Sequence, residues 1–180
     1  WVLSRPILDR FARHYRTNQP MPQALVDRIN NAGTFNQGYA TVEYLSSALV
    51  DMSLHNRPEA IANVDAFERD TLNALGMPRE LAMRHRLPQF GHLFSSDSYS
   101  AGYYSYLWSE TMDADTWEMF EASGNVFDPT AAAGMRNIIL APGNTTDRAE
   151  AYRQFRGRDP DVNALLRTRG FPTSETSQQR

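Results

Sequence analysis

The sequence predicts an all-α protein, on three observations. Apolar residues recur every three or four positions along most of its 180 residues, which is the spacing of one face of a helix. Aspartate, proline and glycine stand at the ends of these runs, where helix caps are expected. No run alternates between apolar and polar residues for more than a few positions, so no strand is predicted. Short connections and the lack of an internal repeat favour one helical domain.

The helices predicted in the first half follow from apolar runs and the residues that interrupt them. They cover residues 2–16, 22–31, 35–55 and 65–76. The first rests on apolar residues repeated every four positions from Ile7 to Tyr15. The second helix would have a proline in its first turn, where proline is favoured. The third helix is the longest, and Asp51 lies off its apolar stripe. Asp65 followed by Glu68 fits a capping box at the start of the fourth.

The helices predicted in the second half begin mainly at aspartates. They cover residues 98–112, 113–124, 129–140, 147–157 and 162–169. Asp113 and Asp115 are expected to start the second of these helices. Asp128, which precedes a proline, starts the third, because a cap followed by proline is a strong N-terminal signal. Asp147 and Asp161 are expected to cap the last two.

Composition limits the classes of function. The net charge of −3 lacks the basic footprint of a nucleic-acid-binding protein, so no nucleic-acid partner is expected. Without cysteine, disulfides and Cys-based metal sites are excluded. No apolar run approaches the ~20 residues of a membrane span, so no membrane partner is expected. Residues 172–180 are polar and predicted to be disordered. The chain starts at Trp1 without methionine or signal peptide, and we expect a piece of a longer protein.

One stretch, residues 92–108, concentrates side chains that can do chemistry. In the predicted helix, Tyr99, Tyr103 and Tyr106 fall within an arc of roughly 60°. Tyrosine and histidine can both donate hydrogen bonds to a developing oxyanion, so His92 and the three tyrosines form the candidate site. The residues alone leave a second interpretation open, an aromatic core helix without a site.

Other polar residues are weaker candidates. The four histidines are far apart in sequence, and the chain has no His-Glu-x-x-His motif, Gly-rich phosphate loop or Gly-x-Ser-x-Gly elbow. Glu43, Asp97 and Glu110 are interpreted as caps or solvated helix residues. A basic cluster near the C-terminus is interpreted as a solvated face, with a bidentate grip on a carboxylate as the alternative. It consists of Arg153, Arg156 and Arg158.

Motifs spread along the chain carry a family resemblance. His-Leu-Phe at 92–94 precedes Tyr-Ser-Ala-Gly-Tyr-Tyr-Ser-Tyr-Leu-Trp at 99–108. Phe-Asn-Gln-Gly-Tyr at 35–39, Leu-Val-Asp-Met at 49–52 and Tyr-Arg-Gln-Phe-Arg-Gly-Arg at 152–158 accompany it. Together they resemble the thimet-oligopeptidase family of zinc peptidases, and within it the bacterial peptidyl-dipeptidase, or dipeptidyl carboxypeptidase, branch.

The resemblance implies a fold and the position of a metal. Residues 1–171 would be the C-terminal part of the catalytic domain of a two-lobed, mostly helical zinc peptidase. In this family two histidines of His-Glu-x-x-His and a downstream glutamate bind the zinc. These ligands would lie upstream of Trp1, so no catalytic metal is expected in this chain.

The resemblance also assigns roles to residues of the candidate site. It implies that His92, Tyr99 and Tyr106 bind substrate and stabilise the tetrahedral oxyanion, and that Tyr103 is a further substrate contact. The loop between the histidine and the first tyrosine is commonly glycine-rich in the family. Here it reads Ser-Ser-Asp-Ser at 95–98, which puts a hinge role in doubt because serine is less permissive than glycine in backbone angle.

The implied function is that of a zinc metallopeptidase fragment, inactive by itself, from an enzyme that releases C-terminal dipeptides from short peptides. Its implied partners are short peptides and the missing upstream part of the same protein. The resemblance favours the cytoplasm, with the periplasm as the alternative. Three other functions stay open: an endo-oligopeptidase of the same family, a non-catalytic helical peptide-binding module, and a helical scaffold with an aromatic core.

Overall fold

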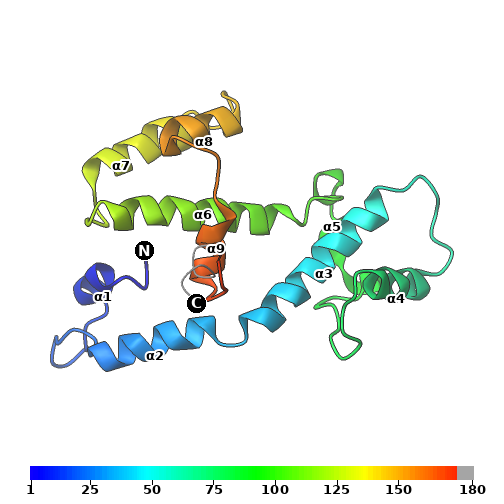
Figure 1. Cartoon of the computed structure of the whole chain (residues 1–180), viewed down its shortest axis with the longest axis horizontal. Coiled ribbons are helices and arrows are strands. Elements are labelled where there is room, and N and C mark those ends of the chain that lie inside the picture. The colour runs from blue at the N-terminus through cyan, green and yellow to red at the C-terminus, as the bar shows by residue number, and fades with distance from the viewer. Residues whose placement is uncertain (174–180) are drawn as a thin grey trace. The chain divides into compact units, whose positions relative to one another are not determined.

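Every regular element that the structure describes is a helix. The structure is a computed structural model and describes residues 1–173. Within this range α1 to α9 follow one another along the chain (Figure 1), and an isolated β-bridge joins Arg13 and Pro20. The predicted all-α class is confirmed. No helix of the described part has both the length and the apolar character needed to cross a membrane. Residues 174–180, most of the tail predicted to be disordered, lie outside the described residues.

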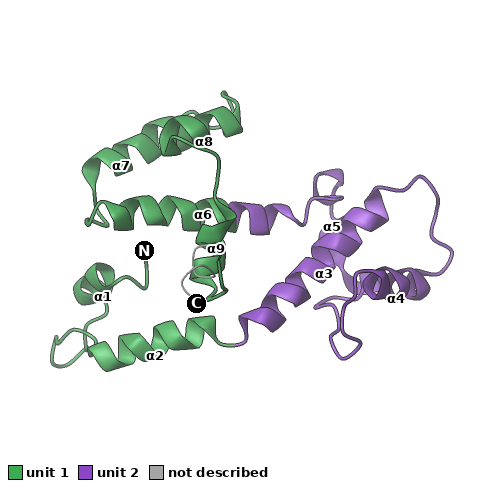
Figure 2. Cartoon of the chain, viewed as in Figure 1, with its two compact units in different colours: residues 1–35, 110–180 green, residues 36–109 purple. Residues whose placement is uncertain are grey.

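The chain forms two compact units (Figure 2). The first consists of residues 1–35 and 110–180, and the second of residues 36–109. Helix α6 (Ser105–Ala122) begins in the second unit and continues into the first. The assignment of residues 1–171 to a single catalytic domain stays a prediction.

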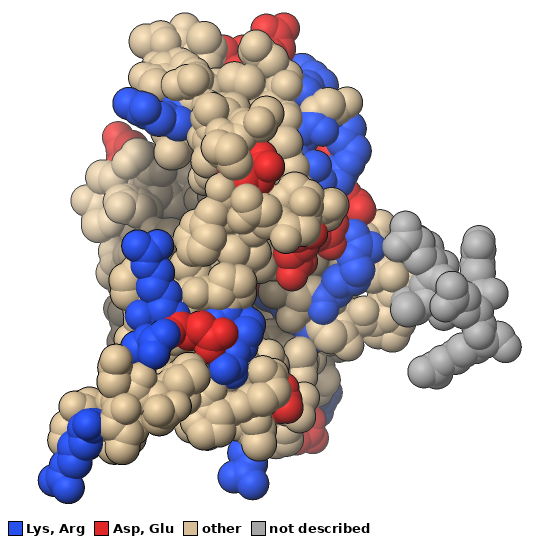
Figure 3. All heavy atoms as spheres, turned by 90° about the vertical axis from the view of Figure 1, so that its left-hand side faces the viewer, with Lys and Arg blue, Asp and Glu red and all other residues tan. Residues whose placement is uncertain are grey.

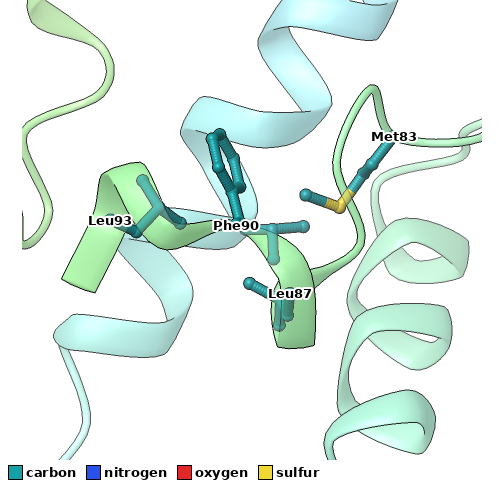
Figure 4. Packing of buried hydrophobic residues seen from close by; sticks show 5 residues of the cluster. Met83, Leu87, Phe90 and Leu93 are labelled. Carbon is teal, nitrogen blue, oxygen red and sulfur yellow. The ribbon is translucent and has the colours of Figure 1, made fainter. Parts of the chain in front are cut away.

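The second unit is built on α3 (Gln37–His55). Helix α4 (Val64–Ala74), the 3-10 turn η1 (Leu87–Gln89) and α5 (Gly91–Phe94) follow along the chain. The core of the unit consists of Val50, Met83, Leu87, Phe90 and Leu93 (Figure 4). Tyr103 of the candidate site packs against this core, so the site is attached to the hydrophobic interior.

Helix α3 buries a partly polar face. Ser47, Val50 and Asp51 are buried, Asp51 completely. The apolar side chains of Val42 and Leu49 are 36% and 43% exposed. The helix has the predicted period, but Asp51, which the pattern places off the apolar stripe, lies on the buried face. A buried carboxylate has to be compensated by hydrogen-bond donors. The buried face of α3 therefore contributes hydrogen bonds as well as apolar packing.

The first unit contains the remaining helices. They are α1 (Arg5–Phe11), α2 (Gln23–Thr34), α7 (Pro129–Gly134), the π-helical turn η3 (Met135–Leu140), α8 (Arg148–Arg156) and α9 (Val162–Thr168). Trp1 packs edge-on against Trp117 and Phe120, with ring centroids 5.0 and 4.8 Å apart. Its Nε1 donates to the carbonyl of Val126 at 3.0 Å, which fixes the first residue of the chain to this unit.

Three aspartates cap helices as predicted. The Asp128 carboxylate accepts from a backbone N–H of the first turn of α7 at 2.7 Å. Asp147 does the same for α8 at 2.8 Å, and Asp161 for α9 at 3.0 Å. Each satisfies one of the N–H groups that a helix leaves unpaired at its start.

Several predicted helix ends in the first half are wrong, and α2, for example, continues to Thr34 beyond its predicted end at residue 31. Asn63 caps α4, accepting from a backbone N–H at 2.9 Å, so Asp65 does not begin a capping box. Glu68 is buried and accepts from a backbone N–H of η1 at 2.9 Å instead of returning to the cap. The first helix ends at Phe11, before the predicted boundary, because the chain then turns back into the β-bridge.

The predicted helix over 98–112 is also wrong. Asp97–Tyr99 forms a single 3-10 turn, η2, and the backbone then enters the left-handed region at Ala101, with φ of +55°. Helix α6 starts only at Ser105 and continues through Asp113, where a new helix was expected. Alanine is a strong helix former, so propensity gives no warning of this break.

Candidate functional site

Four aromatic side chains gather in the second unit. His92 comes from α5, Tyr99 from η2, Tyr103 from the turn before α6, and Tyr106 from the first turn of α6. The centroid of the His92 ring lies 4.6 Å from that of Tyr99, 5.6 Å from that of Tyr103 and 5.7 Å from that of Tyr106. The structure thus brings all the predicted site residues together, but from separate elements and not from one helix face. We call these four residues the histidine–tyrosine cluster.

Two of the phenols reach solvent beside the histidine. The side chains of Tyr99 and Tyr106 are 40% and 49% exposed. The hydroxyl of Tyr106 lies 3.0 Å from Nε2 of His92, a hydrogen bond in which the imidazole tautomer decides the donor. An oxygen atom that gains negative charge would attract these donors more strongly than they attract each other, because charge-assisted hydrogen bonds are stronger than neutral ones.

Tyr103 anchors the cluster to the core. Its ring stacks on Tyr44 at a centroid distance of 5.3 Å and meets Phe90 edge-on at 5.1 Å. Burial raises the pKa of the Tyr103 phenol, and the nearby Arg84 guanidinium opposes part of that rise. The hydroxyl therefore keeps its proton at neutral pH and remains a hydrogen-bond donor.

The turn that carries the tyrosines is tied to α3. Asp51 accepts hydrogen bonds from the backbone N–H groups of Ala101 and Tyr103, at 3.1 and 2.9 Å. A Cβ atom on Gly102 would lie 3.2 Å from the carbonyl oxygens of Ser98 and Tyr99, so this position suits glycine. The backbone of the turn is therefore fixed from both sides.

Comparison with known proteins then decides the family. The family model described as Peptidase family M3 matches residues 1–171. The chain belongs to peptidase family M3. It is 37% identical over 176 residues to the dipeptidyl carboxypeptidase of Escherichia coli (strain K12), with 95% of this chain and 25% of that protein covered. The chain spans about a quarter of the length of the curated relatives that it matches.

Relatives named oligopeptidase A also match the M3 peptidase chain. Organellar oligopeptidase A, chloroplastic/mitochondrial, of Arabidopsis thaliana is 33% identical, with 98% of this chain and 23% of that protein covered. Oligopeptidase A of Haemophilus influenzae is 28% identical, with 95% and 25% covered. The family is thus shared by relatives that carry either name.

The described part of the M3 peptidase chain does not provide a metal site. No three His, Cys, Asp or Glu side chains in residues 1–173 are grouped so that they could hold an ion. Nδ1 of His14 lies 3.3 Å from the backbone N–H of Thr17. His55 contacts Asp51, and the ring of His85 lies 5.1 Å from that of Phe90. The residues present therefore do not fit a catalytic zinc.

The other predicted carboxylates lie outside the cluster. Arg84 donates to Glu43 at 2.8 Å, and Arg169 to Glu110 at 2.6 Å. Asp97 is the exposed first residue of η2. The prediction that these groups are caps or solvated helix residues fits the exposed Asp97, whereas Glu43 and Glu110 form ion pairs with arginines.

The basic cluster is not simply a solvated face. Arg156 and Arg158 both bind the completely buried carboxylate of Asp115, which the sequence had placed at a helix start. Burial by itself would raise the pKa of Asp115, but hydrogen bonds from Arg156, Tyr152 and Arg158 outweigh it and lower the pKa to about 2. Arg153 pairs instead with an exposed aspartate at 3.0 Å. At the surface, Figure 3 shows basic and acidic side chains next to one another on one face of the molecule.

Sequence reasoning missed three residues that hold the site. Tyr44, Asp51 and His55 lie on one face of α3, and each makes a hydrogen bond to the turn or to a residue that does. An aspartate between apolar residues near the end of a helix, with a histidine four residues later, was the available signal. It was insufficient because the identity of the partners depends on a turn fifty residues away in sequence.

Proposed function

We propose that this chain forms the substrate-facing wall of a zinc-dependent oligopeptidase that releases C-terminal dipeptides from short peptides. The observation that carries the proposal is the histidine–tyrosine cluster, in which imidazole and phenol donors from separate elements converge at the surface. Membership of peptidase family M3 supplies the reaction class. The similarity to a relative named dipeptidyl carboxypeptidase supports the dipeptide product.

The chemical role of the cluster follows from its donors. When a peptide carbonyl is attacked, its oxygen becomes negatively charged. His92, Tyr99 and Tyr106 can donate to that oxygen or to neighbouring substrate atoms, and fixed donors at such a position typically stabilise the transition state by a few kcal/mol each. Tyr103, which keeps its proton and is held by the core, adds a substrate contact.

The zinc of the proposal would be bound by residues outside this chain. Such residues would belong to the remaining three quarters or so of the relatives' length. The M3 peptidase chain and that remaining part are then partners within one protein. A cytoplasmic location stays a prediction from the family resemblance.

Replacing one phenol tests the proposal directly. In the intact peptidase we expect Tyr106→Phe to lower kcat by roughly 10²–10³-fold, the usual loss when one oxyanion donor is removed, with a much smaller change in KM. Tyr104→Phe is the matched control, because Tyr104 is a similarly exposed neighbour that lies outside the cluster. Equal rates for both variants would contradict the proposal.

An endo-oligopeptidase is the second candidate. It is favoured by the relatives named oligopeptidase A, which match the same span of the chain. Mass spectrometry of the products from a peptide with a blocked N-terminus separates the two functions. Successive release of dipeptides from the C-terminus supports the first, whereas internal cleavage with longer C-terminal products supports the second.

A further inference from the structure

Asp51 makes contacts that its place in a helix does not require. Its side chain is completely buried in the second unit. Oδ1 accepts from the backbone N–H of Ala101 at 3.1 Å, and Oδ2 from that of Tyr103 at 2.9 Å. The two N–H groups lie on either side of Gly102, so one carboxylate holds both ends of the tight turn. Neither donor is engaged in a helix, and without Asp51 both would need another acceptor.

His55 fixes the orientation of that carboxylate. Its Nδ1 lies 2.8 Å from Oδ1 of Asp51, one helical turn away on the same face of α3. A carboxylate only accepts, so Nδ1 carries the hydrogen and donates it. The approach of the Ala101 N–H to Nδ1, at 3.3 Å, is then a close contact and not a second hydrogen bond. His55 also packs against Phe94, with ring centroids 5.8 Å apart.

The same face of α3 reaches the turn at a third residue. The Tyr44 hydroxyl donates to the carbonyl of Tyr103 and accepts from the backbone N–H of Leu107 at 3.2 Å. The segment 101–107 is therefore held through backbone atoms. This restraint uses backbone atoms of the segment and not the hydroxyl groups of Tyr103 and Tyr106, whose positions therefore depend on α3.

We propose that Asp51, oriented by His55, is a positioning residue that sets Tyr99 and Tyr103 against His92 and Tyr106. The inference rests on the proposed function of the cluster. Asp51 does not itself touch the substrate. Donors to an oxyanion have to be held within roughly 0.5 Å, because a shift of about 1 Å can cost 10²-fold in rate. A bidentate grip on two backbone N–H groups provides that restraint.

The first test removes one acceptor. Asp51→Asn keeps one oxygen and places an amide NH₂ opposite a backbone N–H, so one of the two bonds is lost. In the intact peptidase we expect kcat to fall at least tenfold, with KM changed less than threefold. We also expect faster deuterium exchange in the segment that contains Ala101 and Tyr103, with no change in the peptides of α8. Asp65→Asn, at an exposed ion pair of the same unit, is the matched control.

The second test changes His55 and keeps the buried carboxylate of Asp51. It therefore does not depend on whether the Asp51→Asn variant folds. His55→Asn places a side-chain N–H near the position of Nδ1, whereas His55→Leu removes the donor. We expect His55→Leu to lower kcat roughly tenfold and His55→Asn to restore it to within about threefold. If both variants behave alike, or if Asp51→Asn leaves kcat within twofold of the wild type, the inference is wrong.

Tyr106→Phe separates this inference from the proposed function. A large loss with Tyr106→Phe and none with the Asp51 and His55 variants would leave the proposed function standing and overturn the positioning role. No loss with Tyr106→Phe would overturn both. A loss with Asp51→Asn that comes with exchange increased throughout the protein would indicate general destabilisation and would also contradict the positioning role.

Discussion

Gly102 lies in the turn at a position with little room for a side chain. A Cβ atom there would stand 3.2 Å from two backbone carbonyl oxygens, which cannot rotate away as a side chain could. In the intact peptidase we expect Gly102→Ala to displace the turn by a few tenths of an ångström and to lower kcat roughly three- to tenfold. Steady-state kinetics with a short peptide measures this loss.

Gly91→Ala is the control for that prediction. Gly91 lies in the same unit, and nothing is found within 4 Å of a Cβ atom placed on it. The same added methyl group should therefore leave kcat unchanged. If both alanine variants keep the wild-type rate, the close approach at Gly102 does not restrain the tyrosines.

At the level of single residues, the sequence predicted which side chains form the cluster but not how they meet. The spacing of Tyr99, Tyr103 and Tyr106 fits one helix face. In the structure the backbone breaks at Ala101, and the cluster forms around the ring of His92 instead. Local sequence could not predict the break, because the acceptor that stabilises it is Asp51, on another helix.

Among the elements, α6 and α8 are joined by hydrogen bonds to a buried carboxylate. Asp115 of α6 is completely buried and accepts from Tyr152 at 2.6 Å and from Arg156 at 2.9 Å, both on α8. Its pKa is lowered from 3.8 to about 2, so the unfolded chain binds its proton more tightly than the folded one. The resulting stability is present above pH ~4 and is lost as the pH falls through about 2.

The acid sensitivity of this contact can be isolated with one variant. The shift in pKa corresponds to on the order of 2 kcal/mol of unfolding free energy. We expect Asp115→Asn to be less stable than the wild type at neutral pH, with the difference shrinking by about that amount between pH ~5 and ~2. Urea unfolding of the intact peptidase at several pH values measures it. Asp159→Asn, at an exposed pair, should follow the wild type throughout.

For the elements, most helices were predictable and their buried faces were not. The caps at Asp128, Asp147 and Asp161 are local features, and the sequence predicts them. The burial of Asp51 and Asp115 depends on donors that arrive from distant segments. From sequence alone, a carboxylate in a helix is expected to be solvated unless those donors are known. The sequence therefore did not predict that the two aspartates are buried.

For the molecule as a whole, α3 leaves apolar surface uncovered. Val42, Leu49, Leu72 and Leu75 help to line a hollow of about 220 Å³ in the second unit. Val42, Leu49 and Leu75 are each at least 36% exposed. Contiguous apolar surface commonly marks a contact site. Since the chain spans about a quarter of its relatives, we expect other parts of the intact peptidase to cover this surface.

We proposed that the zinc ligands lie outside this chain and the histidine–tyrosine cluster within it. This division of the site predicts how the chain behaves without the rest of the peptidase. The histidine–tyrosine cluster supplies hydrogen-bond donors, whereas residues 1–173 contain no group of side chains suited to a metal ion. We therefore expect the purified 180-residue chain, supplied with zinc, to show no measurable hydrolysis of a quenched fluorogenic peptide that the intact peptidase cleaves. Turnover by the chain that a chelator abolishes would contradict this division, because a complete metal site would then have to form within the chain itself.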